Sequence, residues 1–353
     1  MPPCSSVRSC VSVKVRRISL ILAFFLSILA ASRLQADNLY AYRDSVKNGY
    51  NFLLYVPDSY ETSETPLPIL LCLHGKSLAG SNLNTITKYG CIDALRRGRE
   101  IDALVICPQC NTTGGWNAER LMHVVNWVMS RYRHDPDRLY CFGISMGGWG
   151  TFKFAAAYPD RVAAAIAMCG GYNGEVEPLG EVPLWILHGT SDTVTALSYS
   201  SSIVEKMAKA GVSGRLQFNW LTGCDHSILA RVFLLKQAYD WLFSHRLSDE
   251  NRPVNREIKI EPQDIRAAYM TIEPGHEKLL PIKNLSKKSS SSGSTTTAPP
   301  PPADGSAVYH TIVSGDTLSA LARKYGTTIQ DLCYLNGISE DTILQLGKKL
   351  RVR

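Results

Sequence analysis

Residues 138–158 of the chain read RLYCFGISMGGWGTFKFAAAY. The apolar residues at the start of this stretch predict a short buried strand, and its second half predicts a helix that is stopped by Pro159. Between them lies a tight turn in which Gly143 and Gly147 flank Ser145. Because these two glycines carry no side chain, strand and helix can pack closely around a strained serine. We therefore predict that Ser145 is an exposed nucleophile at the end of a strand.

Apolar strands and helical segments alternate on both sides of this stretch. The expected strands cover 50–57, 69–75, 103–108, 162–170, 182–189 and 216–221. The expected helices cover 85–97, 119–132, 198–210 and 227–243. Strands that are apolar throughout are typical of a sheet covered on both faces. The alternation predicts an α/β fold with a doubly wound, mostly parallel sheet.

A serine hydroxyl needs a base to take its proton, and the base is usually a histidine oriented by an acid. Asp192 follows the strand expected at 182–189, and His226 lies between the last strand and the last helix. Both positions are at the carboxyl ends of strands, where open α/β sheets place their sites. We predict a triad of Ser145, Asp192 and His226. Asp225 is a weaker alternative for the acid, because it is the direct neighbour of the histidine.

Two backbone N–H groups are candidates for stabilising an oxyanion. One is that of Met146 at the start of the helix, and the other is that of Lys76 in the loop after a strand. Trp116 either walls an acyl or aromatic-ester pocket or is a simple core or surface tryptophan, and the sequence does not choose between them. His74 and His188 each precede a glycine at a strand end, so we expect them to position loops rather than take protons.

Composition shifts divide the chain into four parts. We expect a signal peptide at 1–36, the α/β domain at 37–250, a linker at 251–307 and a small second domain at 308–353. The linker is rich in Ser, Thr and Pro from residue 286 onward, a composition that cannot bury a core.

Charge and hydropathy bear on location and partners. The formal charge of the 353 residues is +7, but acidic and basic residues are nearly balanced in the α/β part, so we expect no nucleic-acid partner. Basic residues precede an apolar run of 14 residues at 18–31, which fits a signal peptide and is too short for a membrane span. We favour cleavage at Ala36, with an uncleaved anchor as the alternative. The mature chain is then exported without a membrane span, to the periplasm, the cell wall or the medium.

The chain has ten cysteines, of which Cys4 and Cys10 would leave with the signal peptide. Those in apolar strands are expected to be buried free thiols. Cys224, next to the predicted catalytic histidine, is the best candidate for a disulfide. A C-x-x-C motif at 107–110 has no second pair of metal ligands, so we expect no metal site there.

These motifs resemble the α/β-hydrolase superfamily over about residues 40–246. The resemblance is carried by Leu-His-Gly at 73–75, Gly-Ile-Ser-Met-Gly-Gly at 143–148, His-Gly-Thr-Ser-Asp at 188–192, and His226. It is most similar to secreted carboxylesterases and peptidases related to feruloyl esterases and polyhydroxybutyrate depolymerases. The resemblance implies ester hydrolysis through an acyl-enzyme. Lys76 departs from the small residue that many relatives carry, and Ile144 argues against the tannase-like branch.

The C-terminal 309–352 resembles a LysM module. That resemblance implies a strand–helix–helix–strand fold and binding of N-acetylglucosamine glycans, either peptidoglycan or chitin. It implies a ligand groove formed by Gly315, Asp316, Thr317, Leu318, Ile338, Ile343 and Leu344. A small packing domain without a ligand is the alternative.

The sequence as a whole predicts an exported serine carboxylesterase tethered to cell-wall glycan, with no metal or organic cofactor. A serine peptidase of the same fold is one alternative, because a triad does not choose between ester and amide. A wall-binding protein with an inactive hydrolase body is the other.

Overall fold

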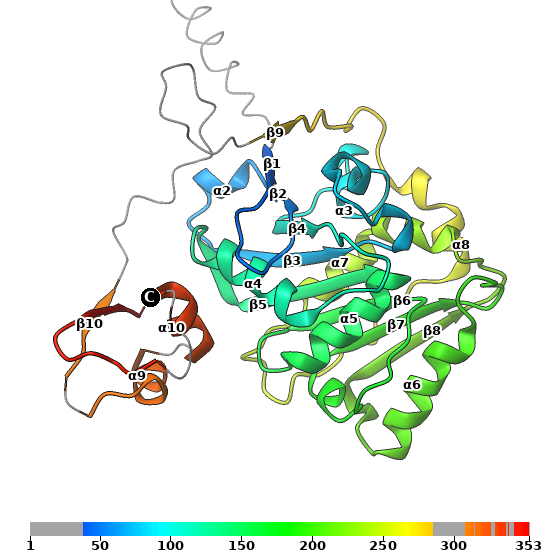
Figure 1. Cartoon of the computed structure of the whole chain (residues 1–353). Helices are drawn as coiled ribbons and strands as arrows, with labels where there is room; N and C mark the ends of the chain where they lie inside the picture. Colours follow the sequence, from blue (N-terminus) through cyan, green and yellow to red (C-terminus); the bar gives the residue numbers. More distant parts are fainter. Residues whose placement is uncertain are drawn as a thin grey trace, which may run out of the picture. The chain divides into compact units, whose positions relative to one another are not determined.

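The computed structural model describes residues 38–284, 308–313, 315–325, 329–336, 338 and 342–352. The expected signal peptide and the Ser/Thr/Pro-rich segment lie outside the described residues. The larger body is built on a nine-stranded sheet (Figure 1) with the strand order β8-β7-β6-β5-β3-β4-β2-β1-β9. Its strands are β1 Asn38–Tyr42, β2 Phe52–Val56, β3 Leu67–Leu73, β4 Leu104–Pro108, β5 His134–Ile144, β6 Ala164–Met168, β7 Leu184–Gly189, β8 Leu216–Leu221 and β9 Ile282–Asn284.

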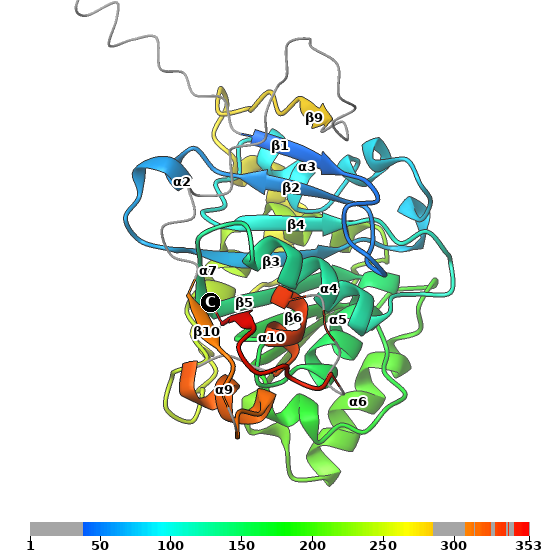
Figure 2. The same cartoon turned by 60° about the vertical axis from the view of Figure 1, so that its left-hand side comes forward.

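Six consecutive neighbours in this sheet, from β8 to β4, run parallel. β2 is antiparallel to both β4 and β1, and β9 is parallel to β1 at the edge, as Figure 2 shows. The prediction of a doubly wound, mostly parallel sheet is confirmed. Because all strands from β3 to β8 point the same way, the loops at their carboxyl ends meet at one edge of the sheet.

Helices cover both faces of the sheet (Figure 1). The α-helices of the body are α2 Ser59–Thr62, α3 Cys91–Arg96, α4 Ala118–Met129, α5 Met146–Ala157, α6 Leu197–Lys209, α7 Lys236–Phe243 and α8 Pro262–Arg266. The 3₁₀ helices are η1 Lys76–Leu78, η2 Leu83–Thr87, η3 Pro178–Glu181, η4 Ser213–Arg215, η5 Ile228–Leu234 and η6 Ala268–Thr271. Buried residues of α4, α5 and α6 share one core cluster, and those of α3, α7 and α8 share the other. In β3, Leu70 and Cys72 face the second cluster while Leu71 and Leu73 face the first, as alternation along a strand requires.

The β5–α5 turn depends on the two glycines that flank Ser145. A Cβ on Gly147 would lie 2.0 Å from the carbonyl oxygen of Leu73 at the end of β3. A Cβ on Gly143 would lie 2.3 Å from the carbonyl oxygen of Gly147. Neither distance is physically possible without moving backbone. The glycines thus allow α5 to begin directly against the neighbouring strand.

The prediction of a single helix at 227–243 is wrong in one respect, because the structure divides this segment into η5 and α7. Leu235 between them is extended, with φ −84° and ψ 125°. Two carbonyls before the break are bound by side chains. Arg99 Nε donates to Leu234 O at 2.8 Å, and the Tyr239 hydroxyl donates to Phe233 O at 2.6 Å. These tertiary bonds replace helical ones, which periodicity along the sequence does not reveal.

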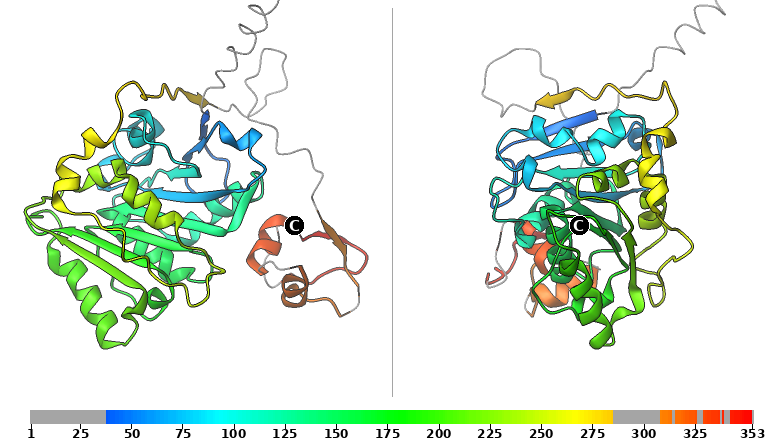
Figure 3. Two further views of the ribbon diagram at one scale, coloured as in Figure 1. Left: turned by 180° about the vertical axis from the view of Figure 1, so that it is seen from behind. Right: turned by 90° about the vertical axis from the view of Figure 1, so that its right-hand side faces the viewer.

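The expected linker does not begin at residue 251. Residues 251–284 pack on the body (Figure 3), with Ile260 and Ile265 fully buried in the same core cluster as α7. The segment ends as β9, which adds a strand to the edge of the sheet. The hydrophobic residues of this segment are too widely spaced to show the periodicity of a helix or a strand, so their burial was not predicted from the sequence.

The described part of the C-terminal region forms β10 Tyr309–Thr311, α9 Leu318–Tyr325, α10 Ile329–Asn336 and β11 Lys349–Arg351. β10 and β11 pair antiparallel, which confirms the strand–helix–helix–strand prediction. The small core of this region is formed by Ile312, Leu318, Leu321, Ala322, Leu332, Cys333, Leu350 and Val352.

The eight cysteines from Cys72 onward are all buried, and none of them forms a disulfide. The expected disulfide at Cys224 is therefore wrong: this side chain is buried and unpaired with another sulfur. In the described ranges, no helix is long and apolar enough to cross a membrane.

We expect Gly147→Ala to lower the free energy of unfolding by about 1–3 kcal/mol, because the Cβ of the new alanine must displace the β3 backbone. Urea denaturation of the full chain measures this. Gly214→Ala is the matched control, since a Cβ there meets nothing within 4 Å, and we expect a change within about 0.5 kcal/mol. Equal stabilities of the two variants would contradict the packing argument.

Candidate active site

Ser145 occupies a strained backbone conformation between β5 and α5. Its φ is 57° and its ψ is −121°, a region that non-glycine residues rarely adopt. Its N–H donates to Met168 O in β6 at 2.9 Å, and its own carbonyl accepts from Trp149 N at 3.0 Å. These bonds hold the strained residue at the carboxyl end of the strand, where its hydroxyl is partly exposed. Strain of this kind, of order 1–3 kcal/mol, persists only where the surrounding structure fixes it.

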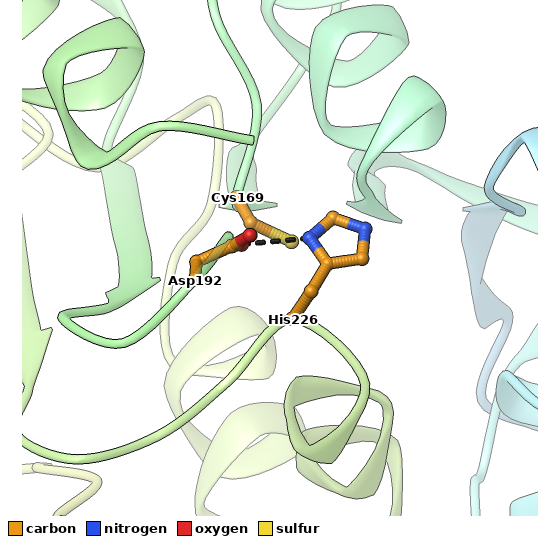
Figure 4. A group of neighbouring side chains, drawn as sticks. All are labelled: Cys169, Asp192 and His226. Carbon is orange, nitrogen blue, oxygen red and sulfur yellow. Dashed lines mark hydrogen bonds and ion pairs between the residues drawn. The ribbon is translucent and has the colours of Figure 1, made fainter. Parts of the chain in front are cut away.

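His226 and Asp192 face one another close to the same edge, as Figure 4 shows. His226 Nδ1 lies 2.7 Å from Asp192 Oδ2. The Asp192 side chain is completely buried, and its Oδ1 accepts the N–H groups of Val194 and Thr195 at 2.9 and 2.8 Å. A carboxylate with these acceptor roles accepts a hydrogen bond from Nδ1–H, which keeps the proton on that nitrogen and leaves His226 Nε2 as the basic one.

The described residues include no hydrogen bond between Ser145 Oγ and His226 Nε2. Bonds of this type are often long or poorly aligned in sites without ligand and tighten only when substrate binds. The structure thus brings Asp192 and His226 into contact, and the described residues show no bond from the serine hydroxyl to that ring.

Asp225, the alternative acid, has another role in the structure. Its Oδ1 accepts hydrogen bonds from Ser227 N and Oγ, both at 2.8 Å, and from Ile228 N at 2.9 Å. The Ile228 N–H, followed by the Ser227 hydroxyl, lowers the pKa of the Asp225 carboxyl. Asp225 therefore shapes the turn that carries His226 and does not bond to its ring.

The loop expected to hold the second oxyanion donor lies against the serine. A Cβ on Gly75 would be 3.4 Å from Ser145 Cβ, so the backbone before Lys76 passes directly beside Ser145. Lys76 begins η1 and Met146 begins α5. The first N–H groups of a helix lack intrahelical partners, so both donors are available to a ligand. The Tyr89 hydroxyl, which the sequence analysis did not single out, accepts the Gly75 N–H at 3.0 Å.

The side chains of His74 and Trp116 hold this loop through hydrogen bonds to its backbone. His74 Nδ1 donates to Gly75 O at 2.7 Å, and its Nε2 accepts the Cys110 N–H at 3.1 Å. Burial lowers the pKa of His74, which keeps the ring neutral, as this bonding requires. Trp116 is only 3% exposed, and its indole donates to His74 O at 3.3 Å. Trp116 thus fits the alternative of a core tryptophan rather than a pocket wall.

His188 is a second histidine that contacts the Asp192 carboxylate. Its Nε2 lies 2.9 Å from Thr195 O and 3.4 Å from Asp192 Oδ2, and its Nδ1 lies 2.7 Å from Ser200 Oγ. The ring is fully buried, and this burial lowers its pKa. Through its contacts with Thr195 and Asp192 the buried ring holds the Asp192 loop, in agreement with the expectation that His188 positions a loop.

Cys169 completes the surroundings of the acid and was not predicted from the sequence. Its sulfur and one ligand atom each of Asp192 and His226 lie within 4.8 Å of one another, the one such group of potential metal ligands in the described residues. Burial, with a further contribution from the charge of Asp192, raises the pKa of the Cys169 thiol, so it stays protonated and does not compete as a nucleophile.

The predicted glycan-binding residues are distributed over two loops of the C-terminal region. Gly315 has a left-handed φ of 91°. Asp316 Oδ2 accepts the Val313 N–H at 2.8 Å and lies 2.6 Å from His310 Nε2, so this carboxylate fixes its own loop. Leu318 is buried in the small core, against which Ile338 and Leu344 pack partly exposed. Ile343 is 86% exposed, and Thr317 is exposed as well, so these two can meet a ligand directly.

Comparison with known proteins agrees with both parts of this description. Residues 44–202 match a family model described as "Putative esterase", and residues 310–353 match the LysM domain. The chain thus carries a region similar to this esterase family, followed by a region that matches the LysM domain. A solved structure titled as a thermostable esterase covers 60% of the chain and 64% of its own length with a TM-score of 0.52 and 22% identity, which supports the α/β-hydrolase fold.

The curated relatives match over short regions. Acetylxylan esterase A of Emericella nidulans is 39% identical over 57 residues, which are 16% of this chain and 19% of the relative. The N-acetylmuramoyl-L-alanine amidase sle1 of Staphylococcus saprophyticus is 54% identical over 43 residues, which are 12% of this chain and 13% of the relative. The chain therefore aligns with less than a fifth of the length of each of these proteins.

We expect Asp192→Asn to lower kcat by on the order of 10⁴, because an amide favours the wrong histidine tautomer. Asp225→Asn is the matched control, since it removes a neighbouring carboxylate that does not bond to the ring, and we expect it to keep most of the activity. Steady-state rates on a soluble phenyl ester compare the two. An active Asp192→Asn together with an inactive Asp225→Asn would move the acid to Asp225.

Proposed function

We propose that the chain is an exported serine carboxylesterase held on cell-wall glycan by its LysM domain. Ser145 is the nucleophile, His226 the general base and Asp192 the acid that orients it. The observation that carries this proposal is the pair at 2.7 Å between His226 Nδ1 and the buried Asp192 carboxylate, at the sheet edge where Ser145 is held in its strained turn. Neither a metal nor an organic cofactor is required by this chemistry.

The reaction proceeds in two halves. His226 Nε2 takes the hydroxyl proton while Ser145 Oγ bonds to the ester carbonyl carbon, and the carbonyl oxygen receives the N–H groups of Met146 and Lys76. The bond from carbon to the alcohol oxygen then breaks, and His226 gives its proton to the leaving alcohol. In the second half, water loses a proton to His226 and attacks the acyl carbon. The bond from that carbon to Ser145 Oγ breaks and releases the acid, and His226 returns the proton to Oγ, which restores the hydroxyl.

The second part of the proposal concerns the LysM domain. We propose that it binds N-acetylglucosamine glycan, peptidoglycan or chitin, through the loops at 315–318 and 338–344. The exposed Ile343 and Thr317 are the side chains best placed for a ligand. Export by a cleaved signal peptide at 1–36 would bring both domains to the wall. Binding of the enzyme to an insoluble polymer raises the local concentration of ester groups on it.

We expect a fluorophosphonate probe to label the full chain on Ser145. Ser145→Ala should lose the label and lower the ester hydrolysis rate by on the order of 10⁴ or more, while its thermal unfolding stays close to that of the native chain. A folded native chain that takes no label would favour an inactive wall-binding protein. A labelled chain that cleaves peptide amides and no ester would favour a peptidase.

We expect the full chain to sediment with insoluble peptidoglycan or chitin, and a chain that ends at Asn284 to stay in solution. Turnover of a small soluble ester should agree within about twofold between the two, because the truncation keeps β9 and the whole body. Ser145→Ala in the full chain is the control, since it should sediment like the native protein. Sedimentation of the truncated chain would assign wall binding to the body instead.

A further inference from the structure

A cleft beside His226 is not used by the reaction described above. Its volume is about 320 Å³, within the range of small-molecule sites. Asp225 and Ser227, the two neighbours of His226 in the chain, line it on one side. Tyr89, whose hydroxyl accepts the Gly75 N–H, lines it on another. The cleft thus borders the loop that carries His226 and, through Tyr89, a residue that hydrogen-bonds the loop proposed to bind the oxyanion.

Three basic side chains line this cleft, namely Lys88, Arg97 and Arg231. The guanidinium carbons of Arg97 and Arg231 both lie 5.0 Å from the centre of the Tyr269 ring, which is 48% exposed. An aromatic face attracts guanidinium groups at this distance. The ring therefore holds both positive charges at the cleft and reduces the entropy that each would lose on binding a ligand.

The two acidic residues in the lining already have partners. Asp93 Oδ2 accepts from Arg97 Nε at 2.8 Å, and Asp225 is occupied by the turn that follows it. Neither Lys88 nor Arg231 forms an ion pair with an acidic side chain in the part of the chain that the structure describes. Three basic and two acidic side chains line the cleft, so its lining carries a net charge of 3 − 2 = +1, and Lys88 and Arg231 are the cations that an anionic ligand can pair with.

We propose that this cleft binds an anionic group on the alcohol part of the substrate, of the kind presented by the carboxylate of an acidic sugar. The proposal rests on the esterase function proposed above. His226 must reach the leaving oxygen to protonate it, so the alcohol lies over the histidine loop. Substituents of that alcohol then extend into the cleft that flanks His226, where Lys88 and Arg231 pair with a carboxylate.

The test uses matched aryl acetates whose leaving group is charged or neutral. The probes are 3- and 4-carboxyphenyl acetate, each compared with the corresponding carbamoylphenyl acetate. For the full chain at low salt, we expect kcat/KM to favour one carboxylate over its carboxamide by about threefold to tenfold, as two partly exposed ion pairs allow. At about 1 M NaCl, where the Debye length is about 3 Å, the preference should disappear.

Lys88→Met and Arg231→Gln should each lower this preference by about twofold or more and leave the carboxamide rates unchanged. Lys88 is exposed, so its replacement does not endanger the fold. Lys209→Met, an exposed change in the last turn of α6, is the control and should alter neither rate. Equal rates within both pairs, or a preference that survives both substitutions, would overturn the anionic subsite and leave the esterase intact. A native chain that hydrolyses none of the probes and takes no fluorophosphonate would refute the esterase function itself, and this proposal with it.

Discussion

The contact on which the site depends is the approach of the α5 backbone to the end of β3. Gly147 sits so close to Leu73 O that not even a methyl group fits between them. Because α5 begins there, Ser145 adopts a backbone conformation with positive φ. Its N–H donates a hydrogen bond to a carbonyl of the neighbouring strand β6. The strain is local, but it is fixed by three neighbouring strands of a buried sheet. Hence the position of the hydroxyl is determined by the packing of the sheet and not by the serine itself.

The acid–base pair depends on a second constraint, which is the burial of Asp192. A buried carboxylate is costly unless its oxygens are bonded, and the structure supplies two backbone N–H groups on one oxygen and His226 on the other. His188 holds the same loop through its contacts with Thr195 and Asp192. Such a carboxylate cannot turn away, so it keeps His226 in the tautomer that leaves Nε2 available to the serine. The protonated Cys169 thiol fills the remaining space without adding a charge.

The cleft proposed to bind an anionic group and the LysM domain would both contact the same polymeric substrate, one near the reacting ester and the other at a distance from it. The cleft would select an acidic group a few ångströms from the reacting carbonyl, and the domain would retain the enzyme on the polymer that carries it. Selection in the cleft depends on charges that salt screens, whereas tethering changes only local concentration. The two contributions can therefore be separated by comparing soluble and insoluble substrates at low and high salt.

The sequence by itself determined the parallel part of the sheet, the order of the two domains and the three residues proposed as a triad. Each of these leaves a local signal: alternating apolar segments, a serine between two glycines, and Asp192 and His226 after strands. It did not reveal the edge strands β1 and β9. It left open whether Trp116 is a core or a pocket residue, since burial depends on what packs against the indole. It missed the burial of 251–284 and the break at Leu235, both of which come from contacts with residues distant in the chain. Tyr89, Cys169 and the cations around Tyr269 belong to four separate segments, and only the tertiary structure brings them beside His226, because no local pattern encodes a contact between them.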